Sequence, residues 1–237
     1  MGEYELVQRS MKISVIFPIY KMWAHTNARL WELYQHGFKH MENLEVVLID
    51  DCSENQEVTK GMNFWVRNGT FPNLIDYVSP VNMGFGASCN KGAELATGDV
   101  VIFHSTDVVI SGDYLSQVLE RLLQNPRCLV GGRLLSHDTG WNKFDRIYPY
   151  LEGWLLACTK EVWNELGGFD PRYGLFDFED VDASTTAVSK GIDLVPLNSP
   201  FLSHVGGLTI YATYGVDGRR AITEKNREIF RQKWVKS

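Results

Sequence analysis

Several features common in other protein classes are missing from this chain of 237 residues. No stretch approaches the roughly 18 consecutive apolar residues of a membrane-spanning helix, and the opening segment MGEYELVQRSMK lacks the apolar region of a signal peptide. The net charge of -6 leaves no excess of Lys and Arg to neutralise a long nucleic acid. These absences favour a cytoplasmic protein, free or attached at the periphery of a membrane, with no integral membrane segment and no long nucleic acid as partner.

Cysteine and proline are also scarce. The 4 cysteines are widely spaced and form no CxxC pair, so the sequence indicates neither a zinc site nor a disulfide framework. With 8 prolines, no internal repeat and no low-complexity linker, the chain is typical of one compact domain spanning residues 1–237.

Two nucleotide-binding motifs are absent or incomplete. No P-loop sequence G-x-x-x-x-G-K-[ST] occurs, and the stretch NMGFGASCNKG departs from the dinucleotide fingerprint G-x-G-x-x-G at Cys89. Hydride transfer on a Rossmann cofactor and P-loop phosphoryl transfer are therefore disfavoured. The glycines of this stretch either let the backbone approach a ligand closely or simply form a tight turn before a helix.

Apolar runs and helical patterns alternate through the first half of the chain. The segments KISVIFPIY, LEVVLIDD, NLIDYVS and DVVIFH are β-rich, and the first is expected to stop at Pro18, which cannot donate to a central ladder. Helical spacing is found between them, at 23–37, around Val58 to Val66, and after the glycines at 84–86. Continuous apolar strands separated by helices predict an α/β fold with a parallel, Rossmann-like sheet.

The second half is less regular. It contains a helical pattern at 114–124, an apolar segment GWLLACTKEVWNELGG, an acidic segment LFDFEDVD and a final amphipathic helix at 222–234. In parallel sheets ligands bind outside the carboxyl ends of the strands. Candidate site residues therefore follow each strand, at 18–20, 50–51, 81–86 and 105–107, although an acid in such a place also serves as a helix cap.

Seven motifs occur in a characteristic order: SVIFPIY, VVLIDDCSEN, NMGFGASCNKG, VIFHSTDVVI, GGFDPRY, DFEDVDAS and HVGG. In this order and spacing, over about residues 12–207, the chain resembles the inverting family 2 glycosyltransferases of the GT-A fold. The resemblance implies a mostly parallel central sheet flanked by helices, with a smaller acceptor-side subregion. Residues 12–107 would form the nucleotide-sugar-binding half, and 108–237 the acceptor-binding half with the C-terminal helix.

The resemblance also implies roles for residues on the donor side. Tyr20 and Asp50 would hold the nucleotide base, with Pro18 and Asp51 beside them. The D-x-D motif, whose last aspartate binds a divalent metal, Mn²⁺ or Mg²⁺, on the donor diphosphate, falls on Ser105, Thr106 and Asp107. Ser105 replaces the first acid, which removes one carboxylate from the metal site. The remaining predicted donor-side residues are Asn82, Gly84, Ala87 and Asn90 along the nucleoside, and His204 as a second metal or diphosphate ligand or as a structural histidine.

On the acceptor side the resemblance assigns Asp180 as the general base and Glu179 to acceptor positioning. Gly153 and Trp154 would border the acceptor and donor sugar, where Trp154 either stacks on a sugar or belongs to the core. Four clustered acids in DFEDVD raise one another's pKa, which suits a base but is also typical of a solvated helix start. Thr186 stands where the family often has an arginine. The tail residues Tyr211, Tyr214, Arg219 and Arg220 are expected on a surface loop or a lid.

The predicted function is transfer of a sugar, with inversion, from a nucleotide-diphosphate sugar to a hydroxyl of a glycan, lipid-linked or other acceptor. A nucleotidyltransferase is one alternative, but it should carry a Gly-rich basic loop after the first strand, where this chain has PIYKMWAHTN. The other alternative is a non-catalytic module that binds a sugar nucleotide or a glycan, suggested by Ser105 and Thr186. The sequence does not identify the sugar, the base, the acceptor or the oligomeric state.

Overall fold

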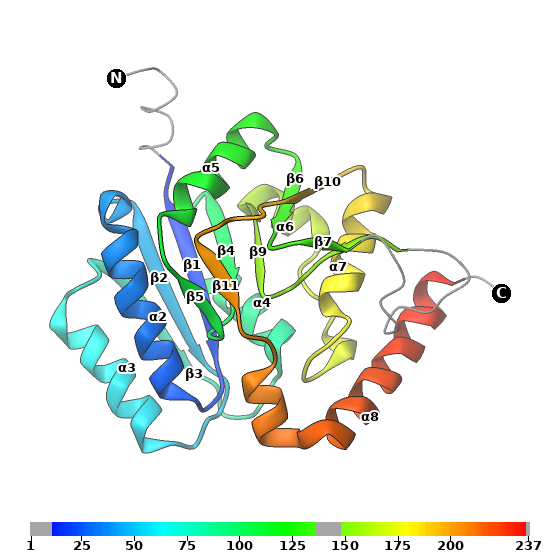
Figure 1. Cartoon of the computed structure of the whole chain (residues 1–237), viewed down its shortest axis with the longest axis horizontal. Coiled ribbons are helices and arrows are strands. Elements are labelled where there is room, and N and C mark those ends of the chain that lie inside the picture. The colour runs from blue at the N-terminus through cyan, green and yellow to red at the C-terminus, as the bar shows by residue number, and fades with distance from the viewer. Residues whose placement is uncertain (1–10, 136–147, 236–237) are drawn as a thin grey trace.

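The computed structural model describes residues 11–135 and 148–235 and has three layers, with helices on both faces of a central sheet (Figure 1). The sheet contains seven strands in the order β10-β6-β9-β4-β1-β2-β3. Their bounds are β1 Ile13–Ile19, β2 Leu44–Asp50, β3 Asn73–Val78, β4 Val100–His104, β6 Cys128–Gly131, β9 Leu155–Thr159 and β10 Asp193–Pro196. A mostly parallel α/β sheet, as the sequence predicts, is confirmed.

Most neighbouring strands are parallel, and one strand departs from this. β4, β1, β2 and β3 form a parallel block, and β6 pairs with β10 in parallel as well. β9 runs antiparallel to both β4 and β6 and joins the two parallel groups. The sequence shows β9 only as an apolar segment, because the apolar residues of a buried strand do not indicate whether it pairs parallel or antiparallel with its neighbours.

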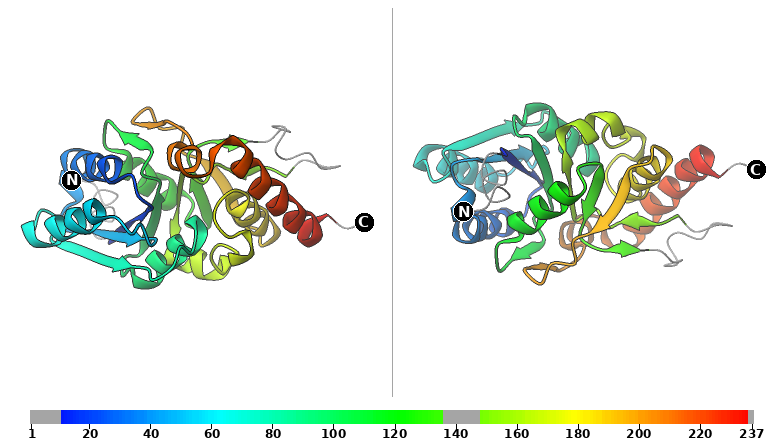
Figure 2. Two further views of the ribbon diagram at one scale, coloured as in Figure 1. Left: turned by 90° about the horizontal axis from the view of Figure 1, so that it is seen from below. Right: turned by 90° about the horizontal axis from the view of Figure 1, so that it is seen from above.

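Alternate residues of the strands pack on opposite faces, so two cores lie on the two sides of the sheet. Val15 and Phe17 belong to the core covered by α2, α3 and α5, whereas Ile16 belongs to the core covered by α4, α6 and α7. Figure 2 shows the helices on both sides of the sheet. The helix bounds are α2 Trp23–His36, α3 Gln56–Asn68, α4 Phe85–Leu95, α5 Tyr114–Gln124, α6 Lys160–Leu166 and α7 Glu179–Ser189, with short 3-10 helices at Phe38–His40 and Pro171–Tyr173.

The predicted stop of the first strand at Pro18 is wrong by one residue. β1 continues to Ile19, with Pro18 paired to Ile49 of β2. The ladder of β1 with β4 ends at Ile16, which pairs with Phe103. Pro18 lies beyond that end, where its missing N–H costs the β4 ladder no hydrogen bond.

Two short two-stranded sheets supplement the central one. β5 (Val108–Ile110) pairs antiparallel with β11 (Leu202–His204), and β7 (Leu134–Leu135) pairs antiparallel with β8 (Tyr150–Leu151). The first of them is important for the site, because it brings a late segment of the chain beside the residues that follow β4.

The last helix, α8, spans Leu208–Trp234 and begins well before the predicted start at Ile222. It is interrupted at Gly215, whose φ of 65° and ψ of -174° are not helical. The expected surface loop is therefore wrong, since Tyr211, Tyr214 and Arg219 lie on this helix. Glycines at 215 and 218 hide the helix in the sequence. None of the helices in the described ranges has the length and apolar character needed to cross a membrane.

Candidate active site

A cavity of about 500 Å³ lies at the carboxyl ends of the strands, between the sheet, the start of α7 and the first part of α8. Donor-side and acceptor-side residues predicted from the sequence line this same cavity. Asp50, Ala87 and Asn90 are not among its lining residues. The predicted residues that line it are Pro18, Tyr20, Asn82, Gly84, Asp51, Ser105, Thr106, Asp107, Gly153, Trp154, Glu179, Asp180 and His204.

The two acids that end β2 have different surroundings. Asp50, the last residue of the strand, accepts a hydrogen bond from the backbone N–H of Ser53 at 3.0 Å. Asp51 lines the cavity and accepts from the N–H groups of Met83 and Gly84 at 2.6 and 2.8 Å. Burial raises the pKa of Asp51, although these hydrogen bonds oppose the rise. Asp51 therefore fixes the loop after β3 to the end of β2, and it is the acid of this pair that reaches the cavity.

The glycine-rich loop allows a close approach of two backbones. Gly84 has a φ of 88°, and a Cβ placed on it would lie 2.1 Å from the carbonyl oxygen of Gly174. Asn90, on α4, donates to the carbonyl of Phe169 and accepts from its N–H, both at 2.8 Å. Asn90 thus holds the GGFD loop against α4, a positioning contact that the sequence does not reveal.

Asp107 and His204 meet on one wall of the cavity. The pairing of β11 with β5 places His204 opposite Val108, the residue after Asp107. Nε2 of His204 lies 3.5 Å from Oδ2 of Asp107. Ser105, which replaces the first acid of D-x-D, donates from its hydroxyl to Oδ1 of Asp107 at 2.6 Å. Ser105 therefore orients the remaining carboxylate.

The electrostatics of this wall favour an ionised carboxylate. Burial by itself raises the pKa of Asp107, but the neighbouring His204 and the hydrogen bond from Ser105 outweigh it and lower the pKa to about 2. A permanently ionised carboxylate and an imidazole nitrogen are suitable donors for a divalent cation such as Mn²⁺. Among the described residues no group of three or more His, Cys, Asp or Glu side chains forms a metal-binding cluster. A cation that takes its remaining ligands from phosphate oxygens and water fits this two-donor set.

Asp180 lines the cavity from the first turn of α7. Its Oδ2 accepts from the N–H of Gly153 at 2.9 Å, and its Oδ1 accepts from the N–H of Val181 at 2.8 Å. Burial and the nearby charge of Asp177 raise the pKa of Asp180 to about 6, against the effect of its hydrogen bonds. A carboxylate with such a pKa has the affinity for a proton that a general base requires near neutral pH.

Glu179 is buried beside Asp180 and has an unused polar atom. Its side chain is 8% exposed and lines the cavity, and its Oε2 has no hydrogen-bond partner among the described residues. Burial, together with the charges of Asp180 and Asp177, raises the pKa of Glu179 well above its usual range. The two neighbouring carboxyls titrate as a pair, so one proton on Glu179 relieves the repulsion that Asp180 would otherwise meet.

The other two acids of the DFEDVD segment bind α8. Asp177 forms an ion pair with Arg219 at 3.2 Å and accepts from the hydroxyl of Thr223 at 2.6 Å. Asp182 accepts from the indole of Trp234 at 2.6 Å and pairs with Lys233 at 2.8 Å. Glu179, Asp180 and Asp177 thus line the cavity, Asp177 binding α8 at the same time, whereas Asp182 holds the C-terminal helix.

Replacement of Asp182 with Ala should lower the free energy of unfolding by about 3 kcal/mol, because Tyr173, Trp234 and Lys233 all lose the same buried acceptor. Urea denaturation measures this change. The matched control is Asp76→Ala on edge strand β3, where the side chain is exposed and a change within about 0.5 kcal/mol is expected. Equal effects of the two substitutions would contradict the structural role of Asp182.

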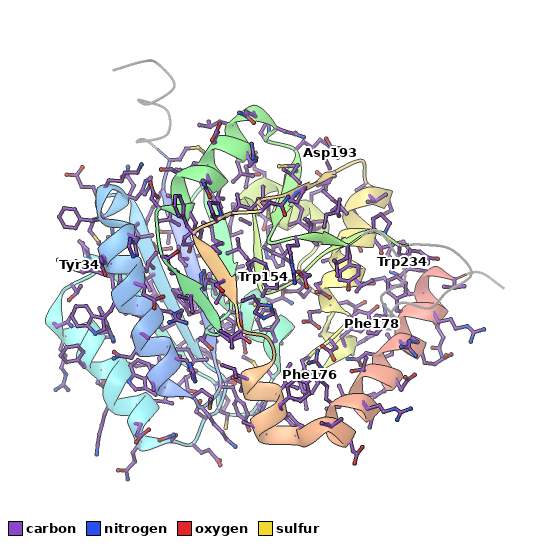
Figure 3. The ribbon with its side chains drawn as sticks, in the orientation of Figure 1. Tyr34, Trp154, Phe176, Phe178, Asp193 and Trp234 are labelled. Carbon is purple, nitrogen blue, oxygen red and sulfur yellow. The ribbon has the colours of Figure 1, made fainter. Side chains whose placement is uncertain are left out.

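Several lining residues were not found from the sequence. They come from the early part of α8 and from the segment before α7, where Phe176 packs against Tyr214 with ring centroids 5.2 Å apart. In Figure 3, Phe176 and Phe178 lie between α7 and α8, and Phe178 packs against Phe230 of α8. Aromatic residues alternating with acids in LFDFED are the one signal that could have indicated this packing. The additional lining residues from α8 are Thr209, Ile210 and Thr223, and Tyr214 and Arg219, which the sequence placed on a loop or lid, line the cavity from this helix as well.

The parallel sheet with one antiparallel insertion, together with a cavity at the strand ends, defines the class of nucleotide-sugar transferase folds called GT-A. Residues 14–184 match the family described as Glycosyl transferase family 2. That match covers well over half of the chain. The protein belongs to glycosyl transferase family 2, and the family and fold class predicted from the sequence are confirmed.

Relatives and solved structures agree with this assignment. A glucosyl-dolichyl phosphate glucuronosyltransferase of Haloferax volcanii is 26% identical over 161 residues, which cover 65% of this chain and 48% of the relative. N-acetylgalactosaminyltransferase 4 of Drosophila melanogaster is 24% identical over 208 residues, covering 73% of this chain and 32% of the relative. The chain therefore matches half or less of the length of these two proteins.

Among solved structures, a mannosyltransferase from Pyrobaculum calidifontis in complex with GDP-Man and Mn²⁺ superposes with a TM-score of 0.72 at 18% identity. The similarity covers 96% of this chain and 66% of that one. The structure of GalNAc-T7 with UDP, GalNAc and Mn²⁺ gives a TM-score of 0.66 at 16% identity, covering 79% of this chain and 43% of the other. At these identities the likeness concerns the fold.

Proposed function

We propose that this protein transfers a sugar from a nucleotide-diphosphate sugar to a hydroxyl acceptor with inversion at the anomeric carbon. The observation that supports this function is the pairing of two sites in one cavity. One wall carries the ionised Asp107 beside His204, and the other carries Asp180 beside Glu179. A transferase needs both, because the leaving diphosphate must be stabilised while the attacking hydroxyl loses its proton.

The donor is proposed to bind at the ends of β1, β2, β3 and β4. Tyr20, Asp51 and Asn82 line this part of the cavity and offer an aromatic ring, a carboxylate and an amide to a nucleoside. Asp107 and His204 would hold a divalent metal at the diphosphate. That ion neutralises charge on the departing nucleoside diphosphate when it is bound. The similar structures contain GDP-Man in one case and UDP in the other, so the base of this protein's donor is left open.

The acceptor is proposed to bind in the cavity beside Asp180 and Gly153. Asp180 takes the proton of the attacking hydroxyl as the new oxygen–carbon bond forms, and the bond from the anomeric carbon to the diphosphate oxygen breaks on the opposite face. The N–H of Gly153 holds one carboxylate oxygen of Asp180 at 2.9 Å and so fixes its direction. Glu179 is proposed to position the acceptor through Oε2, the buried atom that has no partner among the described residues.

Donor binding is tested most simply with nucleoside diphosphates. Adding UDP or GDP together with Mn²⁺ should raise the melting temperature of the purified protein, because a ligand that binds only the folded state stabilises it. Mn²⁺ alone or nucleotide alone should give a smaller shift. An unchanged melting temperature with every nucleoside diphosphate tested, with and without Mn²⁺, would contradict the proposed donor site.

The rate of transfer should fall by about tenfold for each pH unit below about 6. The reason is that the folded protein raises the pKa of Asp180 to about 6. Asp180 is therefore protonated at pH values between about 4 and 6, where an ordinary aspartate is still ionised. A pH–rate profile between pH 5 and 8 measures this, with circular dichroism as a control for folding at pH 5. A constant rate down to pH 5 would contradict a general base with a pKa of about 6.

A further inference from the structure

The three residues that precede β9 contact both walls of the cavity. The N–H of Gly153 donates to Asp180 at 2.9 Å. The carbonyl of Trp154 accepts from the N–H of Ser105 at 3.0 Å, which attaches the segment to the loop that carries Asp107. The indole of Trp154 is stacked on the imidazole of His204, with ring centroids 5.3 Å apart and an angle of 22° between the planes. The segment 152–154 therefore contacts Asp180, the loop that carries Ser105, and His204.

The plane of the Trp154 indole is held from several sides. Its Nε1 donates to Oε2 of Glu152 at 3.1 Å, and Glu152 is itself bound by Arg133 at 2.6 Å. The backbone of Gly132 lies directly against the six-membered ring, since a Cβ on Gly132 would be only 2.0 Å from Cζ2 of Trp154. Figure 3 shows Trp154 near the centre of the molecule, beside β11. Such contacts leave the ring little freedom to reorient toward a sugar.

His204, in contrast, lies on a short segment that is attached through its backbone. In the described part of the chain, β11 has three residues and pairs with β5 alone, and the N–H of Val205 donates to the carbonyl of Asp107 at 3.1 Å. Gly206 and Gly207 follow at φ values of 83° and 65°, in the left-handed region that favours glycine. The side chain of His204 reaches Asp107 at 3.5 Å, a distance too long to fix the ring by itself. The backbone contacts place the segment but do not orient the imidazole, whose flat face stacks on the indole of Trp154.

We infer that Trp154 is a positioning residue for His204: its fixed indole holds the imidazole with Nε2 toward Asp107, so that both side chains address the same cation. This inference rests on the proposed function, in which His204 is a metal ligand. It assigns Trp154 to the metal side of the cavity, whereas the sequence left it either stacked on a sugar or in the core. Residues that orient a metal ligand in this way affect metal affinity without touching the metal.

The test is to titrate the purified protein with Mn²⁺ and to measure the free ion by electron paramagnetic resonance. The Asp107→Asn variant shows how much Mn²⁺ binds elsewhere on the protein. Trp154→Ala should weaken Mn²⁺ binding roughly tenfold, and His204→Ala, which removes the ligand itself, should weaken it further. The double variant should bind Mn²⁺ no more weakly than His204→Ala alone, because both substitutions remove the same contribution to metal binding. Trp154→Phe should recover most of the affinity, since a phenyl ring retains a flat surface for stacking.

Gly132→Ala provides a second variant in which no group of the cavity is removed. The added methyl displaces the indole, so Mn²⁺ affinity should fall here too. Trp31→Ala, an exposed tryptophan on α2, is the matched control and should bind Mn²⁺ as the wild type does. Weakened binding in His204→Ala with wild-type affinity in Trp154→Ala and Gly132→Ala would overturn this inference alone. Wild-type affinity in His204→Ala would overturn the metal role of His204 and, with it, the inference.

Discussion

Replacing Asp180 with Asn is expected to reduce sugar transfer by about 10²- to 10⁴-fold while donor binding stays unchanged. An amide preserves the shape of the side chain, and its single oxygen can accept the hydrogen bond from Gly153 but no longer the one from Val181 as well; it cannot take a proton from the attacking hydroxyl. The rate constant of transfer, measured at saturating donor, reports the loss. The affinity for UDP or GDP with Mn²⁺ reports whether the donor site is intact.

Asp76→Asn is the matched control for this substitution, because it removes the same charge from an exposed position on β3. It should retain wild-type transfer. An Asp180→Asn variant with wild-type transfer would show that another group removes the proton, and Glu179, the neighbouring buried carboxyl, would then be the residue to replace next.

Asp107→Asn is expected to have the second large effect, weakening metal-dependent donor binding by more than roughly 100-fold, since loss of a direct ligand exceeds the 10- to 100-fold cost of losing an outer-shell partner. The amide oxygen carries no charge with which to offset the cation, and His204 would remain as a single neutral donor. Titration of UDP or GDP with and without Mn²⁺, by calorimetry, separates the metal-dependent part of the affinity.

Asp217→Asn, at an exposed position of α8, is the control for Asp107 and should leave this affinity unchanged. Ser105→Ala should have an intermediate effect, because it removes the 2.6 Å hydrogen bond that orients Asp107 but leaves the carboxylate in place. Full metal-dependent binding in Asp107→Asn would contradict the proposed metal site.

The first half of the fold could be predicted from the sequence because its strands are continuous apolar runs. β1, β2, β3 and β4 fall where those runs lie, and α5 falls at the predicted 114–124. The direction of β9 could not be predicted, because its pairing with β4 and β6 depends on segments far apart in the chain. The early part of α8 was missed for a local reason, since Gly215 and Gly218 interrupt its helical pattern.

The site was predicted in part. Motif order brought out Asp107, His204, Asp180 and Glu179, and all four line the cavity. It could not assign separate partners to acids that are close in sequence. Successive residues of a helix point about 100° apart, so Asp180 and Asp182 face Gly153 and α8 respectively. The packing of α7 against α8 decides which partner each acid binds. This packing joins segments that are distant in the sequence, so the motifs do not predict it.

The central claim is most directly tested by incubating the purified protein with a panel of nucleotide sugars, with and without Mn²⁺, and measuring the nucleotide released. The account predicts release of a nucleoside diphosphate from at least one nucleotide sugar, dependent on the metal and lost in Asp107→Asn. Two results would contradict it. Binding of nucleotide sugars without any turnover would indicate a binding module, and release of pyrophosphate from a nucleoside triphosphate and a sugar phosphate would indicate a nucleotidyltransferase.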